Sequence, residues 1–195
     1  IDALLAQGAR ELTIVSNHAG SGDTGLAALI AAGRVRRIVC SFPRHKESWA
    51  FDRLYNAGKL ELELVPQGTL AERIRAAGAG VGAFYTPAAW GTELAKGKET
   101  RVIDGRPHVL EYALRGDVAL VRADRGDRWG NLVYRKAGRN FGPIMAAAAR
   151  TTIAQVREIV SLGALDPEAI VTPGIFVKRI VRVADAGAGR GCDAA

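Results

Sequence analysis

The sequence predicts an α/β protein with a Rossmann-like, mostly parallel sheet flanked by helices and an added β-hairpin region. From residue 12 to about residue 86, short apolar runs alternate with amphipathic helical segments, as in parallel α/β folds. From residue 101 onward, apolar runs flank an Asp-Gly turn, which is typical of a hairpin. The 195 residues suffice for one such domain with a single buried core, which we assign to residues 1–183.

The first half contains the regular alternation. After the end of a helix at residues 1–8, the expected strands span residues 12–15, 38–42, 60–65 and 81–85, and the expected helices span residues 25–32, 47–57 and 69–77. In the second of these helices, Trp49, Leu54 and Tyr55 are expected to face inward. Thr69 and Glu72 have the spacing of a capping box, which predicts that the third helix begins at Thr69.

The second half changes pattern. The expected elements are a hairpin of residues 101–103 and 108–110, strands at 118–121 and 132–134, a helix at 144–149, and strands at 153–160 and 175–183 that complete the sheet. Residues 184–195 are rich in Gly and Ala and have no apolar period, so we expect a disordered tail there.

Composition and charge exclude several classes of protein. The formal net charge is +7, but the basic residues are scattered and no aromatic stripe accompanies them, which disfavours a nucleic-acid partner. An anionic metabolite suits the charge equally well. No apolar run approaches the roughly 20 residues of a membrane span, and no secretory signal opens the sequence, so we predict a cytoplasmic protein. Of the two cysteines, Cys40 lies in an apolar run and is expected to be an inert buried thiol, whereas Cys192 lies in the tail.

A glycine-rich turn follows the first strand. Its residues, Gly20-Ser21-Gly22-Asp23-Thr24-Gly25, match the dinucleotide fingerprint GxGxxG. The fingerprint also requires an acidic residue after the next strand, where this chain instead has Ser41-Phe42-Pro43-Arg44-His45. An arginine there suits a 2′-phosphate, so an NADP-binding module stays an alternative. A turn that shapes another pocket is the better interpretation.

Two further positions are candidates for a site. Gln67 follows a strand and opens a helix, at the carboxyl edge where open α/β sheets bind ligands. His18 lies next to Asn17 in the glycine-rich turn, and the sequence leaves open whether it belongs to a site or to the scaffold. None of the three histidines has the spacing of a metal site, so none is predicted.

Several motifs, in order along the chain, resemble the first subunit of the family I CoA-transferases. They are Ser16-Asn17-x-Ala19-Gly20, Leu62-x-Leu64-x-Pro66-Gln67-Gly68-Thr69-Leu70-Ala71-Glu72-Arg73-Ile74-Arg75, Ala83-Phe84-Tyr85-Thr86-Pro87, Gly97-Lys98-Glu99, Asp127-x-x-Gly130-Asn131, Arg139-Asn140-Phe141 and Val171-Thr172-Pro173-Gly174. The resemblance runs from Ile1 to about Val183. Three segments are most similar to the 3-oxoadipate enzymes, and the acetoacetate enzymes are close relatives. They are Phe42-Pro43-Arg44-His45, Arg128-Trp129-Gly130-Asn131-Leu132-Val133-Tyr134-Arg135-Lys136 and Phe141-Gly142-Pro143-Ile144-Met145.

The resemblance implies a reaction, a partner and a site. Such enzymes move CoA from succinyl-CoA to a 3-oxoacid through a glutamyl-CoA thioester on a second subunit, so no catalytic residue is expected in this chain. We therefore expect a hetero-oligomer, with CoA esters as substrates and no bound cofactor. Asn17 and Gln67 are expected to reach the acyl groups, with His18, Gly20 and Gly68 beside them.

The chain also departs from the family pattern. The family's opening strand and Gly-Gly-Phe turn do not precede Ile1, so we expect an empty position in the sheet. His18 stands where the family has a second asparagine, and Glu99 is expected to be solvated rather than nucleophilic. A CoA-ester-binding module without catalysis stays open as a second alternative.

Overall fold

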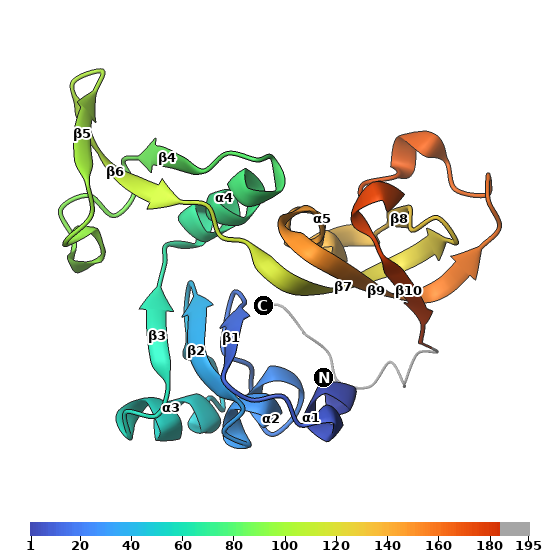
Figure 1. Ribbon diagram of the computed structural model, residues 1–195, viewed down its shortest axis with the longest axis horizontal. Coiled ribbons are helices and arrows are strands. Elements are labelled where there is room, and N and C mark those ends of the chain that lie inside the picture. The colour runs from blue at the N-terminus through green and yellow to red at the C-terminus, as the bar shows by residue number, and fades with distance from the viewer. Residues whose placement is uncertain (184–195) are drawn as a thin grey trace. The chain divides into compact units, whose positions relative to one another are not determined.

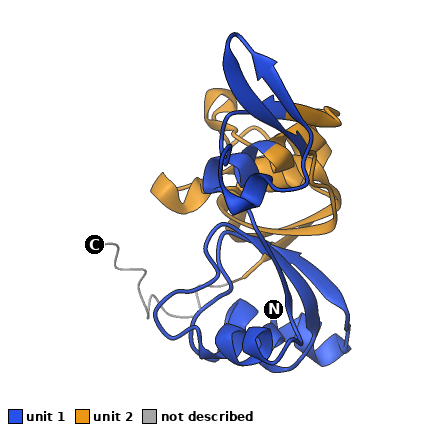
Figure 2. Ribbon diagram, turned by 90° about the vertical axis from the view of Figure 1, so that its left-hand side faces the viewer, with its two compact units in different colours: residues 1–72, 85–111 blue, residues 73–84, 112–195 orange. Residues whose placement is uncertain are grey.

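The computed structural model describes residues 1–183, which divide into two compact units (Figure 2). Unit 1 contains residues 1–72 and 85–111, and unit 2 contains residues 73–84 and the described residues from 112 onward. The predicted disordered tail lies outside the described residues. The assignment of residues 1–183 to one domain stays a prediction. The expectation of a single core is wrong, because each unit has its own hydrophobic cluster.

Unit 1 is built on a parallel sheet with the strand order β1-β2-β3 (Figure 1). Its strands are β1 (Leu12–Val15), β2 (Val35–Cys40) and β3 (Glu61–Leu64), and its helices are α1 (Asp2–Gln7), α2 (Gly25–Ala31) and α3 (Trp49–Asn56). Gly8 ends α1 in the left-handed conformation that favours glycine, and its N–H donates to Leu5 O. The predicted strand–helix alternation is confirmed over this region.

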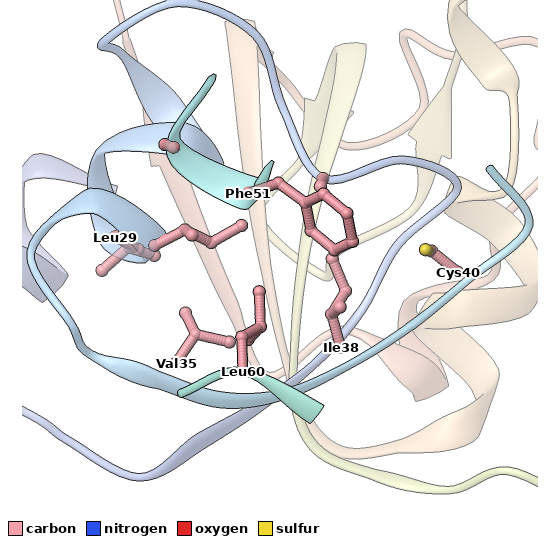
Figure 3. Packing of buried hydrophobic residues seen from close by; sticks show 9 residues of the cluster. Leu29, Val35, Ile38, Cys40, Phe51 and Leu60 are labelled. Carbon is pink, nitrogen blue, oxygen red and sulfur yellow. The ribbon is translucent and has the colours of Figure 1, made fainter. Parts of the chain in front are cut away.

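The core of unit 1 lies between the sheet and the helices α2 and α3 (Figure 3). Leu29 of α2 and Phe51 of α3 pack against Ile38 and Cys40 of the central strand β2, and all four side chains are almost fully buried. Strand β2 is apolar at its carboxyl end because the helices cover it while β1 and β3 flank it. The residues that follow Cys40 at the edge of the sheet are therefore attached to a well-packed core.

The inward face of α3 differs from the prediction. Ala50 and Phe51 are buried, whereas Trp49 is 47% exposed and Tyr55 is 40% exposed. The guanidinium of Arg53 lies 5.8 Å from the ring centroid of Trp49, on the outer side. Only Leu54 among the three predicted inward residues packs against the cluster. The helix begins at Trp49 rather than at residue 47, and its buried side chains are those of Ala50 and Phe51.

Helix α4 (Gln67–Gly78) begins two residues earlier than predicted. Leu70 N–H donates to Pro66 O at 2.8 Å, which closes the first turn and makes Pro66 the residue before the helix. The predicted capping box at Thr69 is therefore wrong, because Thr69 already lies inside the first turn. Its hydroxyl is buried and has no hydrogen-bond partner among the described residues.

The predicted hairpin is confirmed, but it belongs to a separate sheet. Strands β5 (Thr100–Ile103) and β6 (Arg106–Tyr112) pair antiparallel around Asp104 and Gly105. Strand β4 (Ala83–Thr86) neighbours β6 in this three-stranded sheet, and a short 3-10 helix, η1 (Glu93–Ala95), precedes β5. The sequence pattern placed residues 81–85 in the parallel sheet, which is wrong.

Unit 2 contains a four-stranded sheet with the order β10-β9-β7-β8. Its elements are β7 (Gly116–Asp127), β8 (Leu132–Val133), η2 (Lys136–Arg139), α5 (Gly142–Ala148), β9 (Ala149–Val160), η3 (Pro167–Ala169), η4 (Gly174–Phe176) and β10 (Arg179–Arg182). Alternate residues of β7 and β9, such as Val121 and Val156, are buried in the second cluster. The last predicted strands thus form this sheet instead of completing the first, and residues 174–176 are a 3-10 turn.

Candidate functional site

The three parallel strands of unit 1 all end at one edge of the sheet, and a polar residue follows each of them (Figure 1). Asn17 comes after β1, Ser41 comes directly after β2, and Gln67 opens α4 after β3. Gln67 Nε2 donates to Asn17 Oδ1 at 3.0 Å, although the two residues are 50 positions apart. The structure therefore brings together the two amides that the sequence singled out. This edge is where open α/β folds bind ligands.

Ser41 fixes the orientation of the Asn17 amide. Asn17 O accepts hydrogen bonds from Ser41 N at 3.1 Å and from Phe42 N at 3.2 Å, which occupy both of its lone pairs. The Ser41 hydroxyl, 3.1 Å from that oxygen, therefore donates to Asn17 Oδ1, which is 2.5 Å away. With Gln67 Nε2 as a second donor to the same oxygen, Oδ1 points into the network and Nδ2 points out of it.

The network leaves a defined set of polar atoms for a ligand. Among the described residues, no hydrogen bond engages Asn17 Nδ2 or Gln67 Oε1. Asn17 is half-buried and Gln67 is exposed, so both amides can be reached from solvent. The site thus offers amide N–H donors for a carbonyl or carboxylate oxygen, together with one amide acceptor. Neither amide side chain can transfer a proton.

Gly20 shapes the turn behind these amides. Its φ is +86°, and a Cβ there would lie 2.6 Å from the backbone nitrogen of Ala27. Gly20 N–H donates to His18 Nδ1 at 2.9 Å, and Gly22 N–H donates to Glu47 O at 3.0 Å. Two amides of the glycine-rich turn are therefore engaged within the protein, which removes them from the phosphate cradle that an NADP-binding turn requires.

His18 lies in a small aromatic cluster with Phe42 and His45. The ring centroids are 5.9 Å apart for His18 and Phe42, 5.8 Å for His18 and His45, and 6.3 Å for Phe42 and His45. Burial lowers the pKa of His18 below its usual value, and the charge of His45 lowers it further. His18 is therefore neutral at neutral pH, with its proton on Nε2 because Nδ1 accepts from Gly20.

The remaining candidates have simpler surroundings. Gly68 lies in the first turn of α4, and a Cβ there would meet nothing within 4 Å. Glu99 is half-exposed, accepts a hydrogen bond from the Tyr85 hydroxyl, and lies 3.5 Å from Arg101. Cys40 is fully buried, and burial raises the pKa of its thiol to about 11, in agreement with the predicted inert thiol.

Neither the role of Ser41 nor the approach of His45 to His18 was predicted from the sequence. Ser41 has the same signal as Asn17 and Gln67, namely a polar residue just beyond the carboxyl end of a strand. Within residues 1–183, no group of three His, Cys, Asp or Glu side chains has a geometry that could hold a metal ion. No helix in that part of the chain is long and apolar enough to cross a membrane.

Comparison with known proteins identifies the family. The family model described as Coenzyme A transferase matches residues 1–183. The chain belongs to the coenzyme A transferase family. It is 66% identical over 188 residues to a 3-oxoadipate CoA-transferase subunit of Pseudomonas putida, covering 96% of this chain and 81% of that protein. It is 61% identical over 183 residues to the subunit of the same name from Acinetobacter baylyi, covering 94% and 80%.

Solved structures of CoA-transferases share the fold. The glutaconate coenzyme A-transferase of Acidaminococcus fermentans matches with a TM-score of 0.77 at 23% identity, covering 93% of this chain and 64% of that one. The resemblance drawn from the sequence motifs and the predicted α/β class are confirmed. The chain is accordingly a subunit of a CoA-transferase.

Proposed function

We propose that this chain is the first subunit of a transferase that moves CoA from succinyl-CoA to 3-oxoadipate. The observation that carries the proposal is the fixed pair of amides, Asn17 and Gln67, at the carboxyl edge of the sheet of a CoA-transferase subunit. The proposed acceptor follows the names of the relatives that are 66% and 61% identical. A second, different subunit supplies the glutamate, coenzyme A esters are the substrates, and no cofactor is bound.

The chemistry needs a site of this kind. The partner's glutamate attacks the thioester carbonyl of succinyl-CoA, and exchange within the resulting anhydride leaves a glutamyl-CoA thioester and succinate. The carboxylate of the acceptor acid then opens that thioester, and CoA is transferred to the acid while the glutamate is regenerated. Every step passes through a tetrahedral oxyanion, and an amide N–H aimed at it contributes about 3 kcal/mol of transition-state stabilisation.

In that scheme the residues of this chain bind and orient the acyl groups of the substrates. Asn17 Nδ2, turned outward by Ser41 and Gln67, donates to the developing oxyanion. Gln67 presents Oε1 and the second N–H of Nε2 to the acyl group. Neither amide titrates, so these two residues transfer no proton, and the chain is expected to be inactive without the partner's glutamate.

The test is a transfer assay with both chains. This chain is mixed with the second subunit of a 3-oxoadipate CoA-transferase and succinyl-CoA, and either 3-oxoadipate or acetoacetate is supplied. We expect transfer only with both chains present, and faster transfer to 3-oxoadipate. Gln67→Ala should reduce kcat on the order of 100-fold, whereas Asn56→Ala, which removes an exposed amide at the end of α3, should leave it unchanged.

The other outcomes separate the alternatives. Faster transfer to acetoacetate than to 3-oxoadipate would show that acetoacetate, and not 3-oxoadipate, is the preferred acceptor. Transfer that Gln67→Ala leaves intact would exclude the amide pair from the reaction. Nicotinamide-nucleotide binding or CoA-ester binding by this chain, without transfer in the presence of the partner, would favour a binding module.

A further inference from the structure

A second group of polar side chains borders the amide pair. His18 follows Asn17 directly, and His45 lies four residues beyond Ser41, so both imidazoles originate from the segments that carry the amide network. Their ring centroids are 5.8 Å apart, a separation in which one carboxylate between the rings can contact both. The proposed function assigns nothing to these two residues.

Hydrogen bonds fix the ring of His18 and the main chain of His45. His18 Nδ1 accepts from Gly20 N–H at 2.9 Å, so the neutral ring carries its proton on Nε2, which no hydrogen bond within residues 1–183 engages. His45 N–H donates to Ser48 Oγ at 2.6 Å, and Ser48 Oγ donates to His45 O at 2.8 Å. Ser48 is buried, so it anchors the His45 backbone to the start of α3.

The surroundings suit an anion attached to an aliphatic chain. The ring of Phe42 lies within 6.3 Å of both imidazole centroids and adds an apolar surface. Arg44, which precedes His45, donates to Asp52 at 2.6 Å, so this nearby carboxylate is already paired. The charge interaction with His45 lowers the pKa of His18, and an anion between the rings would offset that interaction.

We propose that His18 and His45 form a subsite for the distal carboxylate of a dicarboxylic acceptor acid. The inference rests on the proposed function and deepens it, because it names the feature of the acid that is recognised. An extended six-carbon diacid separates its two carboxyl carbons by about 6 Å, from five bonds of about 1.5 Å. Adjacent residues are about 3.8 Å apart at Cα. A diacid is therefore longer than the Cα spacing of Asn17 and His18, and the subsite requires that it binds Asn17 Nδ2 with one carboxylate and the imidazoles with the other.

The experiment compares two acceptors with the complete two-chain enzyme. 3-Oxoadipate has the distal carboxylate and acetoacetate lacks it. The variants are His18→Asn and His45→Gln. Asn retains an oxygen acceptor for Gly20 N–H but lacks the Nε2 donor, so the turn is preserved while the subsite is not. The matched control is His108→Asn on the β5–β6 hairpin, where the imidazole contacts Arg106 O.

We expect each subsite variant to lower kcat/KM for 3-oxoadipate about tenfold, as for the loss of one hydrogen bond to a charged group. The value for acetoacetate should stay within about twofold. The control should change neither value. An equal fall for both acceptors would overturn the subsite and leave His18 or His45 a general structural role. Unchanged values for both acceptors would also overturn it.

A binding measurement separates this inference from the proposed function. The two-chain complex is titrated calorimetrically with adipate, and with hexanoate as the monocarboxylic control. Weaker binding of adipate to the His18→Asn complex, with hexanoate unaffected, supports the subsite even when no transfer to any acid is observed. Adipate binding that is equal in wild type and variant overturns it even when transfer is fast.

Discussion

Removal of the Ser41 hydroxyl is expected to slow CoA transfer, because the Asn17 amide then loses one of the two donors that fix its orientation. In the structure Oδ1 of Asn17 accepts from Ser41 Oγ and from Gln67 Nε2, which turns Nδ2 outward. Without the Ser41 donor, a 180° rotation of the amide places an oxygen where the reaction needs an N–H. Ser41 acts through Asn17 and is a positioning residue.

The magnitude follows from the energy of one hydrogen bond. A neutral intramolecular hydrogen bond contributes about 1 kcal/mol, which corresponds to about a fivefold preference for one amide orientation. We therefore expect Ser41→Ala to lower kcat about fivefold. Asn17→Ala, which removes the donor itself, should lower it on the order of 100-fold. Ser41 is only half-buried, so the melting temperature of the Ser41→Ala protein should change little.

The assay measures initial rates of the two-chain enzyme with succinyl-CoA and 3-oxoadipate. Ser41→Thr is the matched variant, because it retains a hydroxyl and should restore kcat. Wild-type kcat in Ser41→Ala, or a Thr variant as slow as the Ala variant, would refute the orientation argument. A rise in KM for succinyl-CoA with unchanged kcat would also refute it.

Four further predictions concern the described residues. Gly20→Ala should lower the free energy of unfolding by more than about 2 kcal/mol, because the new Cβ would overlap the backbone of Ala27. Gly25→Ala should lower it by about 1 kcal/mol, because its Cβ would meet no atom and only the left-handed φ is unfavourable. Equal melting temperatures of the two variants would contradict this. Cys40 should resist alkylation in the native protein at pH 8, and rapid modification would contradict its burial. Folding lowers the pKa of His18, so the unfolded chain binds the proton more readily, and the melting temperature should fall as pH drops below about 6.5. His18→Asn should make the melting temperature less dependent on pH in this range. An unchanged dependence would contradict the pKa shift. Asp127→Ala should lower stability on the order of 3 kcal/mol, since its carboxylate accepts three hydrogen bonds from the following turn, and an unchanged melting temperature would contradict this.

Much of the fold of unit 1 was predictable because its signals are local. Apolar runs flanked by glycines predicted the strands β1, β2 and β3, and a left-handed glycine ended α1 as expected. The first residues of the helices and their buried faces were harder to predict. The first hydrogen bond of α4 runs from Leu70 N–H to the carbonyl oxygen of Pro66. The spacing of Thr69 and Glu72 does not indicate this backbone contact. Likewise, an exposed Trp49 is as compatible with an amphipathic pattern as a buried one until the packing partner is known.

Sheet membership was not predictable, because pairing between distant strands depends on tertiary contacts. Strand β4 has the apolar pattern of a parallel strand, yet it neighbours β6 in a different sheet. The site residues likewise include some that the sequence indicated and some that depend on tertiary contacts. The position of Gln67 after a strand indicated a site residue, whereas Asn17 was assigned to the site only by the family motifs, and the hydrogen bond between the two amides was not predicted. The contact between His18 and His45 required the path of the loop after β2, which no local pattern specifies.

We propose that this chain orients the acyl groups while its partner carries the covalent chemistry. The most direct test is the intact mass of both chains after incubation with succinyl-CoA in the absence of an acceptor acid. We predict that thioester-bound CoA accumulates on the partner chain alone, and more slowly with Asn17→Ala in this chain. Bound CoA on this chain, or on neither chain, would contradict the account.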